Sequence, residues 1–240
     1  MTADAPGPVS SSADAAGAVP GAASGPPLTD AQKSLRAQML ATEHWSLLAS
    51  RSTTQSEVLT RIAIFLTLVS AGLVTLGVLG NATEFRGWFG IAALGVLLLL
   101  ALLGAITQIR VFNTATEDLA YVLAMNRLRG AYLDLDPGLE RYFMMGTTDD
   151  GPGVDKTYYP FATRDRTQMF GSSMMVMLVV NTALSGLLVG ALVYAITVSV
   201  GWSIAAGAIV AVAVFLYWMF WGYRSYVQVM RAHVPLRRAS

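Results

Sequence analysis

Four long stretches without a charged side chain constrain this sequence more than any other feature. Each is long enough, at about 1.5 Å per helical residue, to cross most or all of the roughly 30 Å hydrocarbon core of a bilayer. Charged residues make up only 13% of the chain, about half the share of a soluble domain. The pattern therefore predicts an all-α membrane protein with four transmembrane helices. The four stretches are 62–80, 88–108, 172–198 and 202–221.

The distribution of basic residues predicts the orientation. If the four spans form two hairpins, 15 of the 16 Lys and Arg residues fall on one side, and only Arg86 falls on the other. Basic loops stay in the cytoplasm, so we expect both termini and the central segment there. A composition rich in Arg, Ala, Gly and Val is typical of a bacterial genome with high GC content. The expected location is thus the bacterial plasma membrane.

The spans divide the chain into segments. Residues 1–27, rich in Ala, Pro, Gly and Ser, predict a disordered tail, and residues 28–61 a cytoplasmic amphipathic helix opened by a capping box at Thr29 and Gln32. The first hairpin is 62–109, the cytoplasmic extension and loop 110–168, the second hairpin 169–223, and the basic cytoplasmic tail 224–240. We expect the second span to continue as one helix to about Leu133 and to stop at Asp136, before Pro137.

The loop after this helix contains many turn-forming residues. Residues 137–143 predict a short helix, and residues 147–160 a turn-rich loop. Asp149, Asp150 and Asp155 suggest a cation site, but their spacing does not match a calcium loop. We therefore expect a solvated turn.

The central helix carries the candidate cytoplasmic interaction surface. Apolar and aromatic residues recur there at spacings of three and four, which places them on one face. The surface consists of Met125, Arg127, Leu128, Arg129 and Tyr132. We expect the two arginines, together with Arg141, to pair with the nearby carboxylates, and the alternative is that Arg127 and Arg129 bind anionic lipid headgroups. The carboxylates are those of Asp134, Asp136 and Glu140.

The third span contains small and polar residues that suit helix packing. A Gly-x-x-x-Gly step allows close approach of helix backbones in lipid, and polar side chains form interhelical hydrogen bonds. Lining the lumen of a pore is the alternative role. The residues concerned are Asn181, Thr182, Ser185, Gly186 and Gly190.

The residue content of the chain argues against most classes of enzyme and against ion-coupled transport. The chain has no cysteine and only two histidines, and it lacks the nucleotide-binding, hydrolase and zinc-protease motifs. The spans contain no ionisable residue, which argues against a pump or a proton-coupled transporter. We therefore expect no enzymatic activity, no cofactor, no metal and no nucleic-acid partner.

Residues 125–133, Met-Asn-Arg-Leu-Arg-Gly-Ala-Tyr-Leu, followed by Leu-Glu-Arg-Tyr-Phe at 139–143, resemble a group of uncharacterised actinobacterial multi-pass membrane proteins. The entry to the first span, residues 61–67, is similar to theirs, and the likeness covers roughly residues 45–150. It implies no activity. In layout alone, residues 29–133 resemble the SLATT-type membrane effectors, which are thought to form oligomeric pores and lack a second hairpin.

These observations favour a non-enzymatic membrane protein that binds a cytoplasmic protein partner or itself. The first alternative is a homo-oligomeric channel or pore. The second is a membrane enzyme that uses the carboxylates of Asp134, Asp136 and Glu140.

Overall fold

The computed structural model describes residues 28–161 and 171–239, and these contain helices and no strand. The long helices are α1 (Asp30–Ala82), α2 (Phe89–Leu135), α5 (Ser173–Thr197) and α6 (Val200–Ala232). A 3-10 helix, η1 (Pro137–Tyr142), and a short helix, α3 (Gly151–Tyr158), follow α2. The tail predicted to be disordered, residues 1–27, lies outside the described residues.

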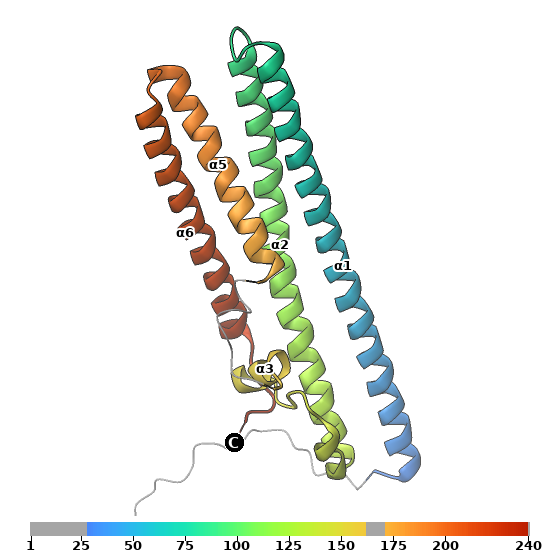
Figure 1. Cartoon of the computed structure of the whole chain (residues 1–240). Coiled ribbons are helices and arrows are strands. Elements are labelled where there is room, and N and C mark those ends of the chain that lie inside the picture. Colours follow the sequence, from blue (N-terminus) through green and yellow to red (C-terminus); the bar gives the residue numbers. More distant parts are fainter. Residues whose placement is uncertain (1–27, 162–170, 240) are drawn as a thin grey trace, which may run out of the picture.

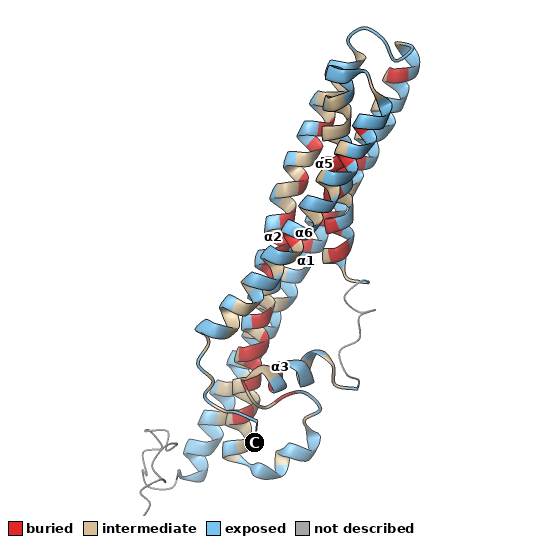
Figure 2. Ribbon diagram, turned by 90° about the vertical axis from the view of Figure 1, so that its left-hand side faces the viewer, coloured by how far each residue is buried: buried red, intermediate tan, exposed pale blue. Residues whose placement is uncertain are grey.

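Each of the four long helices contains a stretch that is long and apolar enough to cross a membrane. This confirms the predicted all-α class and the four apolar helices. Helices α1 and α2 run side by side over their whole length, and α5 lies between α2 and α6 (Figure 1). The buried residues follow the inner sides of the helices down to the level of α3 (Figure 2).

Helix α1 begins at the predicted capping box. The amide of Thr29 donates to Oε1 of Gln32 at 2.9 Å, and the amide of Gln32 donates to Oγ1 of Thr29 at 3.3 Å. The helix then continues without a break through Arg61 into its apolar half, as predicted.

Helix α2 is the central element, because it contacts α1, η1, α3, α5 and α6. It extends as one helix beyond its apolar half to Leu135, which confirms the predicted extension. It stops at Asp136, whose side chain accepts a hydrogen bond from the amide of Gly138 at 2.9 Å in the first turn of η1.

The prediction of an irregular loop at residues 147–160 is wrong in its second half. Residues 151–158 form α3, because Asp150 caps the helix by accepting from the amide of Gly153 at 3.0 Å and Pro152 lies in its first turn. Asp, Gly and Pro are typical of turns, but an aspartate followed closely by a proline is also typical of a helix start. Here the second role prevails.

Candidate interaction surface

The halves of α1 and α2 that carry charged residues form what we call the stalk, residues 30–61 and 110–135. Within the stalk, Asp118 of α2 binds side chains of α1 and of the neighbouring helix α3. Its carboxylate accepts from Nε of Arg51 at 2.6 Å, from the amide of Gln55 at 2.8 Å and from the hydroxyl of Tyr158 at 2.6 Å. Burial and the adjacent Asp118 raise the pKa of Tyr158, so the phenol stays a hydrogen-bond donor at physiological pH.

A second charged cluster marks the boundary between the stalk and the apolar halves of the helices. Glu57 of α1 accepts from Arg110 of α2 at 3.0 Å and from Arg61 at 2.9 Å, and Arg110 also donates to Glu117 at 2.8 Å. Hydrogen bonds from Arg110 and then Arg61 lower the pKa of Glu57. Beyond this cluster neither helix carries a charge until the turn at residues 83–88.

The structure divides the predicted surface of α2 between the interior and the outside. Met125 is only 2% exposed and packs with Leu119, Val122 and Val154, so it belongs to the core at this end of the molecule. Leu128 is half-buried. Tyr132 lies between two other rings, 6.5 Å from His44 and 6.4 Å from Phe143, centroid to centroid.

The predicted pairing of the two arginines with the carboxylates of residues 134–140 is wrong. Arg127 forms an ion pair with Asp149 instead, and Arg129 donates to the side-chain oxygen of Asn126 at 2.8 Å. Asp134 pairs with Arg237, and Asp136 caps η1. The partners of Arg127 and Asp134 lie 22 and 103 residues away in the sequence, where spacing along one helix gives no signal.

Asp149 is fully buried, so the predicted solvated turn is wrong at this residue. Its carboxylate accepts from the amides of Leu236 and Arg237 at 3.1 and 2.8 Å, and from Arg127. Burial alone would raise the pKa of Asp149, but these hydrogen bonds lower it below its usual value. We call this contact between Asp149 and residues 233–239 the C-terminal latch.

Further contacts extend the latch along the same segment. Nε2 of His233 donates to the carbonyl oxygen of Asp149 at 2.6 Å, and Arg127 donates to the carbonyl of Val234 at 2.7 Å. The amide of Ala239 donates to Asp150 at 2.6 Å. The latch therefore joins α2, the loop before α3 and the segment after α6.

Asn126 is the buried residue that holds this loop against α2, and sequence reasoning did not single it out. Its amide nitrogen donates to the carbonyl of Thr148 at 3.0 Å, and its oxygen accepts from the hydroxyl of Thr157 at 2.8 Å as well as from Arg129. A fully buried asparagine needs such partners. Its position in the helix sequence carried no sign of them.

The Gly-x-x-x-Gly step of α5 packs against α6 of the same chain. A Cβ atom at Gly186 would lie 2.8 Å from the carbonyl oxygen of Gly207, and one at Gly190 would lie 3.2 Å from that of Ser203. The step thus serves packing within one chain.

The polar residues of α5 are also directed inward. Asn181 is 1% exposed and lies against Gly104 of α2, where an added Cβ would be 2.6 Å from its side-chain oxygen. Thr182 is buried and donates to the carbonyl of Val179, and Ser185 donates to that of Asn181. All three therefore lie in or beside helix contacts of a single chain.

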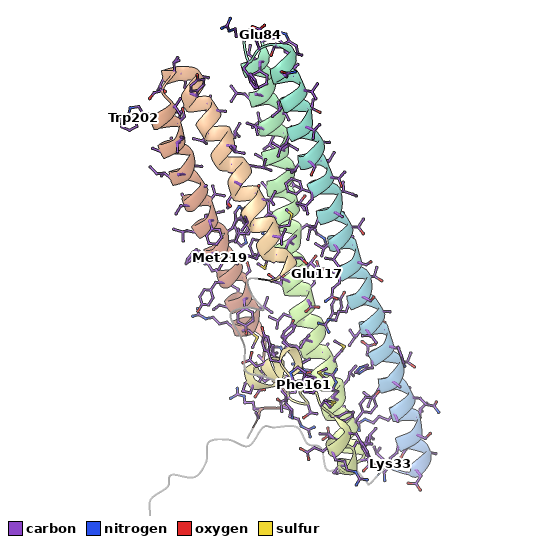
Figure 3. The ribbon with its side chains drawn as sticks, in the orientation of Figure 1. Lys33, Glu84, Glu117, Phe161, Trp202 and Met219 are labelled. Atoms are coloured by element: carbon purple, nitrogen blue, oxygen red, sulfur yellow. The ribbon has the colours of Figure 1, made fainter. Side chains whose placement is uncertain are left out.

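The outer face of α1 in the stalk bears large apolar side chains. Leu35, Met39 and Trp45 are 54%, 63% and 69% exposed, while Leu47, on another side of the helix, packs against the core. This part of α1 also carries Lys33, which lies at the opposite end of the molecule from Glu84 (Figure 3). We call Leu35, Met39 and Trp45 the apolar face of the stalk.

Residues 28–161 and 171–239 contain no group of three or more His, Asp or Glu side chains placed to hold a metal ion. The carboxylates of Asp134 and Asp136 have the structural partners described above. Glu140 lines a polar hollow of about 460 Å³, whose lining also includes Lys156 and Arg238.

No protein-family profile, curated protein or solved structure matches this chain. The resemblance of residues 125–143 to the actinobacterial membrane proteins therefore stays a prediction, and so does the likeness in layout to the SLATT-type effectors.

Proposed function

We propose that this is a non-enzymatic protein of the bacterial plasma membrane whose stalk lies in the cytosol and binds proteins, a second copy of the chain first of all. In this arrangement α1–α2 and α5–α6 are two transmembrane hairpins with both termini inside the cell. The positive-inside rule supports this orientation, because the segments before residue 62, between residues 109 and 169 and after residue 223 together carry 15 of the 16 Lys and Arg residues.

The observation that carries the proposal is the apolar face of the stalk. Leu35, Met39 and Trp45 lie beyond the charged cluster of Glu57 and Arg110, where water rather than lipid surrounds the helix. Large apolar side chains gathered on one helix in water typically mark a binding site for another protein. Asp118 of α2, which binds Arg51 and Gln55, holds the helix that bears this face in the stalk.

The small and polar residues of the spans are already in contact with other helices of the same chain. This favours the stalk, rather than the spans, as the site of self-association. Gly186 and Gly190 pack against α6, Asn181 is buried against Gly104 of α2, and Thr182 is buried as well. A pore built from these residues would require α5 to leave its present partners.

A cysteine cross-linking experiment tests the proposal, because the chain has no cysteine of its own. Thr42 is exposed between Met39 and Trp45, so a T42C variant in native membranes should form a disulfide-linked dimer on mild oxidation. Adding Trp45→Glu should abolish the dimer. The matched control is Lys156→Cys, an exposed position on α3, which should remain monomeric.

If T42C stays monomeric, or if Trp45→Glu leaves the cross-link intact, self-association through this face is wrong. A closed ring of four or more subunits that survives Trp45→Glu in mild detergent would favour the pore instead.

A further inference from the structure

One face of α6 changes along its length from aromatic to basic. Tyr217, Trp221, Arg224, Gln228 and Arg231 follow one another at spacings of four and three, which places them on a single side of the helix. All five are exposed. This face begins beside Met219 and continues along the rest of α6 towards its C-terminal end (Figure 3).

The order of these residues matches the layers of a membrane boundary. The uncharged stretch of α6 ends at Tyr223, directly before Arg224, and tyrosine and tryptophan prefer the depth of the lipid headgroups. Arg224 lies one turn beyond Trp221, about 5 Å along the axis, and Arg231 about 10 Å beyond that. A lipid beside this face would place its acyl chains against the aromatic rings and its phosphate near Arg224.

The face is hollowed at this depth. Tyr217, Phe220, Trp221, Arg224, Ser225 and Gln228 line a hollow of about 360 Å³. The guanidinium of Arg224 lies 5.9 Å from the centre of the Phe220 ring, which holds it beside the apolar part of the hollow. A guanidinium binds phosphate through two parallel hydrogen bonds, and the neighbouring hydroxyl and amide groups of Ser225 and Gln228 are suited to the same oxygens.

The charges of Arg224 and Arg231 are not neutralised within the described part of the chain. Arg51, Arg110, Arg127 and Arg237 each form an ion pair with a carboxylate, whereas no ion pair among residues 28–161 and 171–239 includes Arg224 or Arg231. The sequence contains no acidic residue at all between positions 167 and 240. This end of α6 is therefore complementary to an anion.

We propose that this face of α6 is a binding site for an anionic phospholipid, with the phosphate on Arg224, the acyl chains on Tyr217, Phe220 and Trp221, and Arg231 adding long-range attraction. The site is separate from the apolar face of the stalk, so it stands or falls independently of self-association.

Native mass spectrometry of the full chain in mild detergent tests the site. Titration with phosphatidylglycerol and with phosphatidylcholine should show tighter binding of the anionic lipid. Arg224→Gln should weaken phosphatidylglycerol binding about fivefold, the effect of one arginine near an anionic surface, and leave phosphatidylcholine unchanged. The control is Arg36→Gln, which removes the same charge from the exposed start of α1 and should change neither.

Two further measurements test whether the paired hydrogen bonds and the acyl chains contribute to binding. Arg224→Lys keeps the charge but loses the paired hydrogen bonds, so it should restore only part of the binding. Inorganic phosphate in excess should not displace phosphatidylglycerol, because it has no acyl chain for the aromatic rings. Equal binding of both lipids, an unchanged affinity in Arg224→Gln, or displacement by phosphate would each overturn the proposal.

Discussion

At the scale of single residues, a few buried polar side chains make the contacts that hold distant segments of the chain together. Asp149 and Asn126 are fully buried, and between them they hold the loop before α3 and the C-terminal segment against α2. Polar groups in such places specify one arrangement, because any other would leave them without partners. Their removal is therefore a sharp test of the fold at this end of the molecule.

Replacing Asp149 by Asn should release the C-terminal latch. The asparagine side chain has the same shape as aspartate, but Arg127 loses its carboxylate partner. One of the backbone amides of Leu236 and Arg237 then faces an NH₂ group instead of an acceptor oxygen. We expect a loss of about 2–4 kcal/mol in local stability, seen as faster hydrogen exchange at residues 234–239. Asp155→Asn, at an exposed position of α3, is the control, and equal exchange in both variants would contradict the role of the latch.

The latch should also respond to acid in a defined direction. The pKa of Asp149 is lowered by folding, so its contribution to stability is complete above the ordinary aspartate value and is lost as the pH falls through the lower, folded value. Hydrogen exchange at residues 234–239 should be slow and constant from about pH 5 to 8 apart from its intrinsic pH dependence, and should accelerate only below about pH 4. Acceleration near pH 6 would show that another group controls the segment.

At the scale of elements, two different contacts hold the helices in pairs. In the stalk, Arg51 of α1 and Asp118 of α2 meet through two hydrogen bonds, at 2.6 and 3.2 Å, with little exposure of either side chain. In α5 and α6, glycines let the two backbones touch. One pair thus depends on charge and the other on the absence of side chains.

Replacing Arg51 by Gln should loosen the stalk. Asp118 would keep its bonds to Gln55 and Tyr158 but lose its ion pair, at a cost of about 1.5–3 kcal/mol. Limited proteolysis between residues 30 and 57 should then become faster. Arg61→Gln, which removes the more exposed partner of Glu57, should have no measurable effect, and similar proteolysis of the two variants would argue against the special role of Arg51.

Replacing Gly186 by Ala should push α5 and α6 apart. The new methyl group would meet a backbone carbonyl that cannot move alone, and we expect a cost of about 1–3 kcal/mol in the free energy of unfolding. Gly95→Ala on α2 is the matched control, since no atom lies within 4 Å of its added Cβ and the change should be neutral or slightly stabilising. Both effects are measurable by unfolding in mixed micelles, and a neutral Gly186→Ala would refute the close contact.

The elements were more predictable from sequence than their contacts. The start of α1 at Thr29, the long extension of α2 and its end at Asp136 follow from local rules of capping, periodicity and proline geometry. Asp149 and Asn126 could not be recognised, because all their partners except Arg129 lie 22 to 88 residues away. The same polar residue types also occur both in solvated turns and at buried hydrogen-bonded positions. Met125 was correctly placed on a contact face of α2, but the face packs within the chain.

At the scale of the whole molecule, charge and hydropathy divide the structure into an apolar part and the stalk. Lys33 lies near the start of α1, and Glu84 lies in the turn that follows its end (Figure 3), so the two residues would lie on opposite sides of a membrane that α1 spans. The proposed orientation places Lys33 inside the cell and Glu84 outside.

Single cysteines at these two positions should test that orientation. In intact cells, a membrane-impermeant maleimide should label Glu84→Cys and not Lys33→Cys, and after lysis it should label both. Lys33 labelling in intact cells would place the stalk outside and overturn the cytosolic location.

The unbroken course of α1 from the stalk into the apolar half gives the molecule the properties of a lever. In the proposed orientation, the 32 residues from 30 to 61 would extend about 48 Å from the bilayer boundary, and an apolar helix adjusts its tilt to the thickness of the lipid around it. A change in tilt of about 10° would carry the tip of α1 sideways by about 8 Å. In that orientation, a continuous α1 would convert a small change in membrane thickness into a large displacement of Leu35 and Met39.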